Sequence, residues 1–110
     1  MATIEDFQAI DIRVGTVLQA EPFPEARKPS LKLVIDFGPG LGLRRSSAQI
    51  TTHYSPETLV GRQVVAVVNF PERRIAGFAS QVLVLGAMVH AHEVVLLNVD
   101  APVPDGSPIA

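Results

Sequence analysis

A chain of 110 residues has room for one domain with a single hydrophobic core. Apolar residues make up 47% and charged residues 18%, which excludes a disordered chain, and the absence of cysteine excludes disulfides and thiolate metal sites. No apolar run is long enough to span a membrane, and the acidic start lacks the layout of a signal peptide. We therefore expect a cytoplasmic protein.

Charge and apolar content both indicate partners. All nine Lys and Arg lie between Arg13 and Arg74 with only five acids, whereas residues 1–12 and 75–110 each carry −3. This distribution predicts a positive region of surface, and the alternative is that the charges scatter over loops. The apolar content is high for so small a domain, which predicts that surplus apolar surface is covered in a homodimer.

The first expected elements are a helical turn and a strand. Thr3 and Asp6 have the spacing of a capping box, and the turn they begin is predicted to carry Phe7 and Ile10 into the core. Residues 12–19 alternate as a half-buried strand does. One predicted face of this strand holds Ile12, Val14, Thr16 and Leu18.

Prolines punctuate the next part of the chain. Three of them make residues 22–30 a loop, because proline cannot donate to a strand ladder. Residues 31–37 alternate as a second strand, and a Gly-Pro-Gly turn at 38–40 follows. Residues 43–50 predict a third strand, which is polar for its length, so one of its faces is expected to meet water or a ligand.

A short helix is predicted between Ser55, a suitable N-cap, and Gly61, a suitable left-handed exit. Residues 63–70 then predict a strand that is buried on both faces, and residues 71–74 predict a turn.

The rest of the chain predicts short strands and a tail. A strand pair is expected at 75–78 and 82–85, and a last strand at 94–97. Residues 100–110 are expected to form an ordered loop or a loose end. Three strands, a short helix and further strands indicate a mostly β fold, a five-stranded OB-type barrel with one short helix between strands 3 and 4, in a single domain spanning residues 1–110.

The inventory of reactive groups predicts no catalytic site. No Gly-x-Ser-x-Gly elbow and no phosphate-cradling Gly-x-x-x-x-Gly-Lys loop occurs. His90 and His92 are too few for a zinc site, and exposed loop histidines are the simpler interpretation. We therefore expect a binding protein that is not an enzyme and has no metal or cofactor.

Six segments resemble one known family. Residues 11–15 (DIRVG), 31–38 (LKLVIDFG) and 59–61 (LVG) resemble the tRNA-binding domain, an EMAP-II-like OB fold shared by the methionyl-tRNA synthetase C-terminus and free-standing tRNA-binding proteins. Residues 26–30 (ARKPS), 46–51 (SSAQIT) and 69–86 (NFPERRIAGFASQVLVLG) are similar to its CsaA branch, whose members are export-related chaperones.

The resemblance implies a homodimer of OB barrels with a tRNA-type groove and affinity for unfolded or precursor polypeptides. Lys32 matches the lysine of the family's Leu-x-Leu strand, and Ser80 matches the serine of its Ser-Glu-Gly-Met segment. The chain departs from that segment at residues 81–83, where Gln-Val-Leu replaces Glu-Gly-Met. Branched Val82 in place of glycine argues against tight tRNA binding.

Two functions from different classes follow. An RNA-binding module would use a basic groove, although aromatic platforms are few, at 5% with no Trp. Its predicted contacts are Arg27, Lys28, Lys32, Arg44, Arg45, Arg73 and Arg74, with Ser80 added by the resemblance.

A polypeptide-binding module would use an apolar cleft instead, and the alternative for each of its residues is plain core. Its predicted lining is Phe23, Phe70, Phe78 and Leu83. The resemblance favours an ATP-independent chaperone for unfolded or export-precursor polypeptides. The alternative is a structure-specific tRNA-binding protein that acts in trans.

Overall fold

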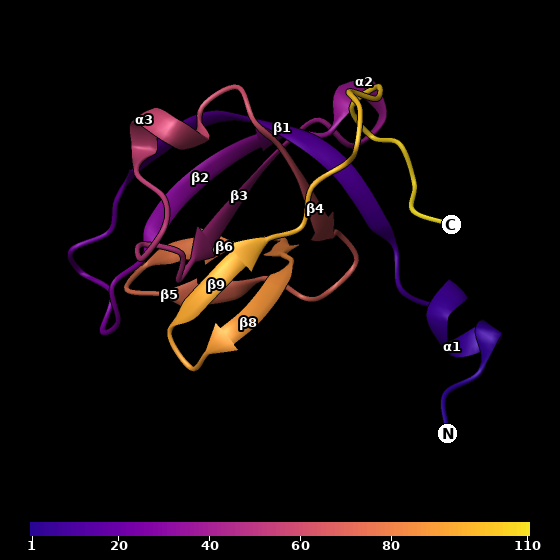
Figure 1. Cartoon of the computed structure of the whole chain (residues 1–110), viewed down its shortest axis with the longest axis horizontal. Coiled ribbons are helices and arrows are strands. Elements are labelled where there is room, and N and C mark those ends of the chain that lie inside the picture. Colours follow the sequence, from indigo (N-terminus) through magenta and orange to yellow (C-terminus); the bar gives the residue numbers. More distant parts are fainter.

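The fold is a small antiparallel β-barrel. The computed structural model describes residues 1–110, and five strands form one sheet in the order β3-β2-β1-β4-β7 (Figure 1). Two further hairpins, β5–β6 and β8–β9, form separate two-stranded sheets. The elements are α1 (Ile4–Gln8), β1 (Ile12–Pro22), β2 (Leu31–Asp36), α2 (Gly38–Leu41), β3 (Leu43–Ala48), α3 (Pro56–Leu59), β4 (Gln63–Val67), β5 (Arg73–Ile75), β6 (Phe78–Ser80), β7 (Leu83–Val84), β8 (Gly86–His90) and β9 (Glu93–Leu96). The predicted OB-type barrel is confirmed, with α3 between β3 and β4.

Side chains complete the barrel between β3 and the segment that joins β6 to β7. The backbone N–H of Gln81 donates to the carbonyl of Arg45 at 2.8 Å, and its side-chain oxygen accepts from the N–H of Arg45 at 2.9 Å. The buried Ser46 hydroxyl donates to the carbonyl of Val82 at 2.8 Å. These bonds replace a regular ladder at the seam and leave the barrel nearly closed.

The core fills the barrel with aliphatic side chains and one phenylalanine. Strand β2 buries every second residue, as its alternation predicts. Helix α3 places Leu59 fully inside, and Gly61 follows it with a φ of +89°, the left-handed exit that the sequence predicts. The largest fully buried side chains are Phe37, Leu33, Ile35, Leu59, Val14, Val17 and Val64.

Strand β1 differs from its expected pattern because it contains a bulge. The pairing register with β2 shifts between Val17 and Gln19, so the side chains after the shift exchange faces. Val17 is buried, whereas Leu18, which was predicted on the same face as Val14, is 43% exposed.

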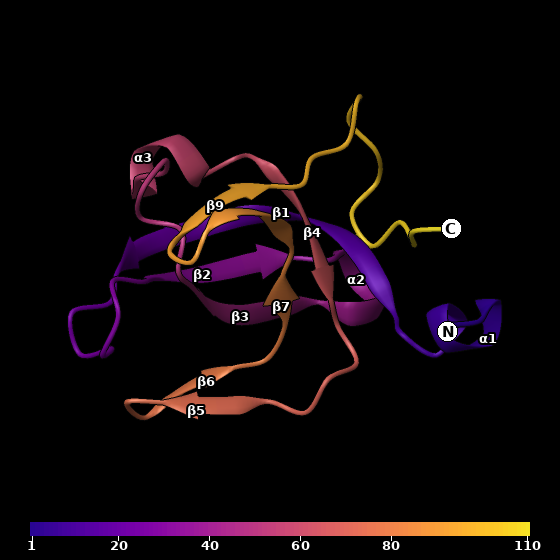
Figure 2. The ribbon, with the colours of Figure 1, turned by 60° about the horizontal axis from the view of Figure 1, so that its bottom comes forward.

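The prediction that α1 carries two side chains into the core is wrong. The capping box at Thr3 is present, but no residue of α1 is buried, and Phe7 and Ile10 are each 38% exposed. Figures 1 and 2 show α1 away from the barrel. Its attachment is polar, because the side-chain amide of Asn69 accepts from the N–H of Asp11 and donates to the carbonyl of Ala9.

The region after β4 also corrects the sequence reading. Residues 64–68 are buried as predicted, but Asn69 and Phe70 are exposed. Residues 71–74 do not make the turn, because Arg73 and Arg74 already belong to β5. The chain turns at Ala76 and Gly77, whose φ values of +48° and +81° suit a tight two-residue hairpin.

The last part of the chain is more ordered than the sequence predicts. Residues 86–90, for which no strand was predicted, pair with β9. The tail runs beside the start of β1, where Val14 accepts from Gly106 N–H at 2.7 Å and donates to the carbonyl of Ser107 at 3.0 Å. The Thr16 hydroxyl donates to the carboxylate of Asp105 at 2.6 Å. None of the helices is long and apolar enough to cross a membrane.

Candidate nucleic-acid and polypeptide interface

The outer face of β2 and β3 carries a row of polar side chains. Lys32 lies opposite Ser47 in the register of these strands, and Arg45 lies opposite Val34. The neighbours of these residues along each strand, such as Leu33 and Ser46, are buried. Because side chains alternate along a strand, Lys32, Arg45 and Ser47 share the outer face.

Two phenylalanines join this row and form what we call the aromatic–cation cluster, Phe23, Phe78, Lys32 and Arg45. The rings of Phe23 and Phe78 meet edge to face, with centroids 5.5 Å apart and an interplanar angle of 66°. Lys32 Nζ lies 4.8 Å from the centre of the Phe23 ring and 5.5 Å from that of Phe78, and Arg45 Cζ lies 5.6 Å from the Phe78 ring. Both distances to Phe78 are within the range of cation–π attraction.

Burial separates the roles of the two rings. Phe23 is 3% exposed and supports the cluster from beneath, so it offers little surface to a ligand. Phe78 is half-buried and can be reached from solvent. The only carboxylate within salt-bridge distance of Lys32 is the exposed Glu21, at 3.9 Å, and such surface pairs contribute little. The cluster is therefore an accessible ring flanked by two cations.

Ser80 and the residues after it hold the barrel seam. The Ser80 hydroxyl accepts from the N–H of Ser47 at 3.0 Å, which places it beside the polar row and leaves its own proton to donate. Gln81 bonds the backbone of Arg45 in both directions. Val82 packs in the core, so the branched side chain that departs from the family segment adds its bulk inside the barrel rather than on the outer face.

The remaining predicted RNA contacts lie elsewhere. Arg44 alternates with Arg45, shares the face of buried Ser46, and donates to the carbonyl of Leu41 at 3.2 Å. Arg73 and Arg74 are exposed on the β5–β6 hairpin. Arg27 and Lys28 are exposed in the loop between β1 and β2. The structure thus brings Lys32, Arg45 and Ser80 together and leaves the other five apart from them.

The four predicted polypeptide contacts do not line a common cleft. Phe23 and Phe78 belong to the aromatic–cation cluster, whereas Phe70 follows β4 and Leu83 lies in β7. Phe70 and Leu83 are 46% and 48% exposed.

Sequence reasoning missed a second apolar surface on the β8–β9 hairpin, because the polar ends of residues 86–90 concealed a strand. Its exposed side chains are Met88, Val89 and Val95, with Leu97 just beyond β9.

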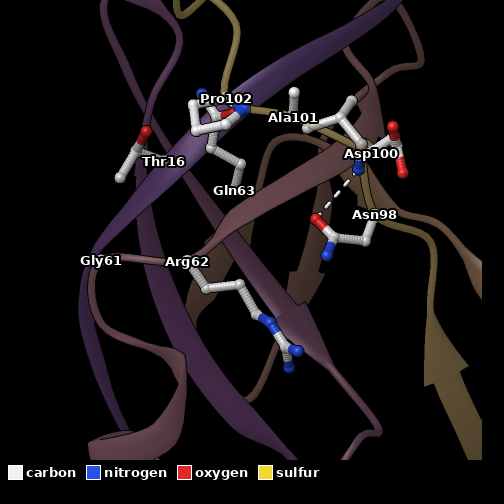
Figure 3. Close-up of a pocket in the computed structure, with 9 residues that line it drawn as sticks. Thr16, Gly61, Arg62, Gln63, Asn98, Asp100, Ala101 and Pro102 are labelled. Carbon is white, nitrogen blue, oxygen red and sulfur yellow. Dashed lines mark hydrogen bonds between the residues drawn. The ribbon is translucent and has the colours of Figure 1, made fainter.

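The two main clefts are lined mostly by polar residues and contain none of the four predicted polypeptide contacts. The first, of about 560 Å³, lies between the start of β4 and residues 98–102 (Figure 3). Arg62 points away from Thr16 and Gln63 in this view, and its guanidinium lies over the ring of Tyr54 at 5.2 Å. No set of like-charged groups converges in this cleft, so it suggests no particular ligand.

The histidines do not form a metal site. His53 Nε2 lies 2.7 Å from a carboxylate oxygen of Glu93, a contact between residues 40 apart that the sequence gave no means to foresee. His90 and His92 are exposed at the end of β8 and in the turn after it. No group of three or more His, Asp or Glu side chains gathers as metal ligands would.

Comparisons with known proteins agree with this geometry. The chain matches the family described as "Putative tRNA binding domain" over residues 12–108. It is 38% identical over 108 residues to a methionine–tRNA ligase of Thermotoga maritima, covering 98% of this chain and 16% of the ligase, and 47% identical over 83 residues to that of Porphyromonas gingivalis, covering 76% and 12%. The chain therefore spans less than a fifth of these curated relatives.

Solved structures resemble the whole chain. The chaperone CsaA from Bacillus anthracis is 55% identical, with a TM-score of 0.95, over 100% of this chain and 99% of that one. The CsaA chaperone protein from Picrophilus torridus is 47% identical, with a TM-score of 0.91, over the full length of both chains. A MetRS-related protein from Pyrococcus horikoshii is 28% identical, with a TM-score of 0.87, over 100% and 98%. This chain belongs to the tRNA-binding domain family, and solved CsaA chaperones are among the structures it is most similar to.

Proposed function

We propose that this chain is an ATP-independent chaperone of the cytoplasm that holds unfolded or export-precursor polypeptides. The observation that carries the proposal is the exposure of Phe70 and Leu83, two large apolar side chains that nothing in the chain covers. Similarity to two CsaA chaperones over the full chain supports it. Burial of apolar area contributes about 25 cal/mol per Å², less the cost of ordering the client, so affinity near micromolar is expected.

We further propose that the chaperone acts as a homodimer. A helix as short as α1 is not stable by its own propensity, and its polar attachment through Asn69 leaves Ile4, Phe7 and Ile10 facing solvent. A second copy that covers these side chains supplies the packing that α1 lacks. The apolar side chains of the β8–β9 hairpin offer further surface for the same contact.

The decisive experiment follows the aggregation of an unfolded model protein by light scattering. We expect the wild-type protein to suppress aggregation at both low and high salt, because apolar burial is not screened. The double variant Phe70→Ser with Leu83→Ser should suppress it less. The matched control is Leu43→Ser, which changes an equally exposed leucine at the start of β3. Equal loss in the control, or no suppression by the wild type at any ratio, would refute the proposal.

The second candidate function is tRNA binding, and the aromatic–cation cluster favours it. OB folds bind single strands by combining cations, which contact phosphates, with aromatic rings, on which bases stack. Phe78 with Lys32 and Arg45 provides both within about 6 Å.

A tRNA titration at several salt concentrations tests this candidate. Removing Lys32 and Arg45 together should lower the log–log salt slope by about 1.4 to 1.8, since each lost phosphate contact removes about 0.7 to 0.9. Arg62→Ala, whose guanidinium lies over Tyr54, is the control and should leave the slope unchanged. A slope that is flat in the wild type would exclude this function.

A further inference from the structure

A second cleft, of about 310 Å³, lies at one end of the polar row on β3. Three segments far apart in the sequence build it: the β1–β2 loop, the residues that follow β3, and the turn between β8 and β9. Its lining is Arg27, Lys28, Pro29, Gln49, Thr51, Thr52 and His92. We call it the loop cleft.

Every polar side chain of the loop cleft can donate a hydrogen bond, and none is a carboxylate. Arg27 and Lys28 bring two positive charges, and Gln49 and Thr51 bring an amide and a hydroxyl. The nearby carboxylate of Glu93 is engaged by His53 at 2.7 Å. Donors with two positive charges and no lining acid select an anion, and guanidinium with ammonium is the combination that binds phosphate oxygens.

Hydrogen bonds fix the walls of the cleft. The hydroxyl of Thr52 donates to the carbonyl of His92 at 3.1 Å and so ties the segment after β3 to the β8–β9 turn. The hydroxyl of Ser30 donates to the carbonyl of Lys28 at 2.8 Å and fixes the end of the β1–β2 loop. The cleft is therefore built by tertiary contacts and does not depend on the chance approach of surface lysines.

Position and size identify the ligand class. Arg45, Ser47 and Gln49 alternate along β3, so the outer row that begins beside Phe78 leads to the cleft over roughly 13 Å, four residues at the strand rise. A volume of about 310 Å³ is at the small end of ligand sites and exceeds what one phosphate group needs. The cleft has no aromatic side chain for a base to stack on, so recognition must fall on the phosphate.

We propose that the loop cleft is a phosphate subsite that holds one nucleotide of an RNA strand lying along β3, separate from the aromatic–cation cluster. This inference rests on the second candidate function and adds to it a site with its own residues. Since the two sites lie about 13 Å apart, their contributions to the binding free energy of a strand that reaches both should add.

The test is an NMR titration of the full chain with a nucleoside 5′-monophosphate, with the unphosphorylated nucleoside as the matched ligand. We expect the monophosphate alone to shift the amide signals of Arg27, Thr51 and His92. Arg27→Ala with Lys28→Ala should weaken this binding at least tenfold, because two charge-assisted contacts are lost. Thr51→Val, which leaves the charge unchanged, should weaken it about fivefold through one lost hydrogen bond. Arg73→Ala with Arg74→Ala removes the same charge elsewhere and should have no effect.

A titration with single-stranded RNA separates failure of the subsite from failure of RNA binding. If the wild type binds RNA and the monophosphate leaves the loop cleft unshifted, the subsite is refuted and the second candidate function stands. If no RNA binds at all, both are refuted. If an acidic peptide shifts the cleft signals and the monophosphate does not, the cleft binds acidic segments of clients and the RNA assignment is overturned. Equal weakening by the Arg73 and Arg74 variant would show that only net charge matters, which also refutes the subsite.

Discussion

Replacing Phe78 by leucine should separate RNA binding from polypeptide binding. Leucine keeps an apolar side chain of similar reach but removes the ring that contacts Phe23 at 5.5 Å and lies near both Lys32 and Arg45. One edge-to-face pair contributes about 0.5 to 1.5 kcal/mol beyond its area, and an exposed cation–π contact about 0.5 to 1 kcal/mol. We expect the free energy of unfolding to fall by about 1 to 2 kcal/mol, measured in urea, with the barrel intact.

The effect on RNA binding should be larger than the effect on stability. Stacking of one base contributes about 1 to 3 kcal/mol, so Phe78→Leu should weaken RNA binding roughly 5- to 150-fold. The salt slope should not change, because Lys32 and Arg45 remain to contact phosphates. Suppression of aggregation should stay within about twofold of the wild type, since the apolar area is largely retained.

Fluorescence anisotropy with a labelled RNA at four salt concentrations measures both the affinity and the slope. Phe70→Leu is the control, because it removes an exposed ring that has no cation beside it. The reasoning fails if Phe78→Leu binds RNA as the wild type does, or if Phe70→Leu loses as much affinity. A fall in the salt slope would show instead that the ring acts only by positioning the two cations.

Three further substitutions test the assembly and the barrel. Phe7→Asp should turn the species near twice 11.8 kDa into one of 11.8 kDa by sedimentation, and a wild type that sediments only as 11.8 kDa at micromolar concentration would contradict the homodimer. Ser46→Ala should lower stability in urea by about 1 to 3 kcal/mol, because it leaves the buried carbonyl of Val82 without its donor. Gly106→Ala should also be destabilising by more than about 1 kcal/mol in the same assay, since its φ is +89° and a Cβ would lie 2.5 Å from the carbonyl oxygen of Phe37; an unchanged midpoint would show that the tail does not pack as described.

The elements that sequence predicted well are those whose evidence is local. The alternation of residues 31–36 and the cap and exit of α3 at Ser55 and Gly61 lie within one element each, and all were found. The bulge at Leu18 was missed because it arises where β1 must pair with both β2 and β4 in different registers. The exposure of α1 was missed because capping residues define where a helix begins and not what it packs against.

The candidate site was only partly predictable for the same reason. Lys32 and Arg45 were among seven predicted cations, but their convergence depends on the pairing of Val34 with Arg45, which is a tertiary fact. The neighbouring Arg44 was predicted as an equal contact, although the period of two along a strand places it on the other face. The proximity of Phe23 to Phe78 joins residues 55 positions apart through a loop, and no local pattern records it.

The arrangement of these groups explains how one small barrel can serve two kinds of ligand. Charge acts over a distance and is screened by salt, so Lys32 and Arg45 attract an RNA strand most strongly at low ionic strength. Apolar burial acts only on contact and persists in salt, so Phe70 and Leu83 hold a client under both conditions. Phe78 is the one accessible side chain that suits both, since its face can stack a base and its area can bury an aliphatic side chain. Because both ligands would need this ring, occupancy by one should weaken the other, and ionic strength decides which of them is held.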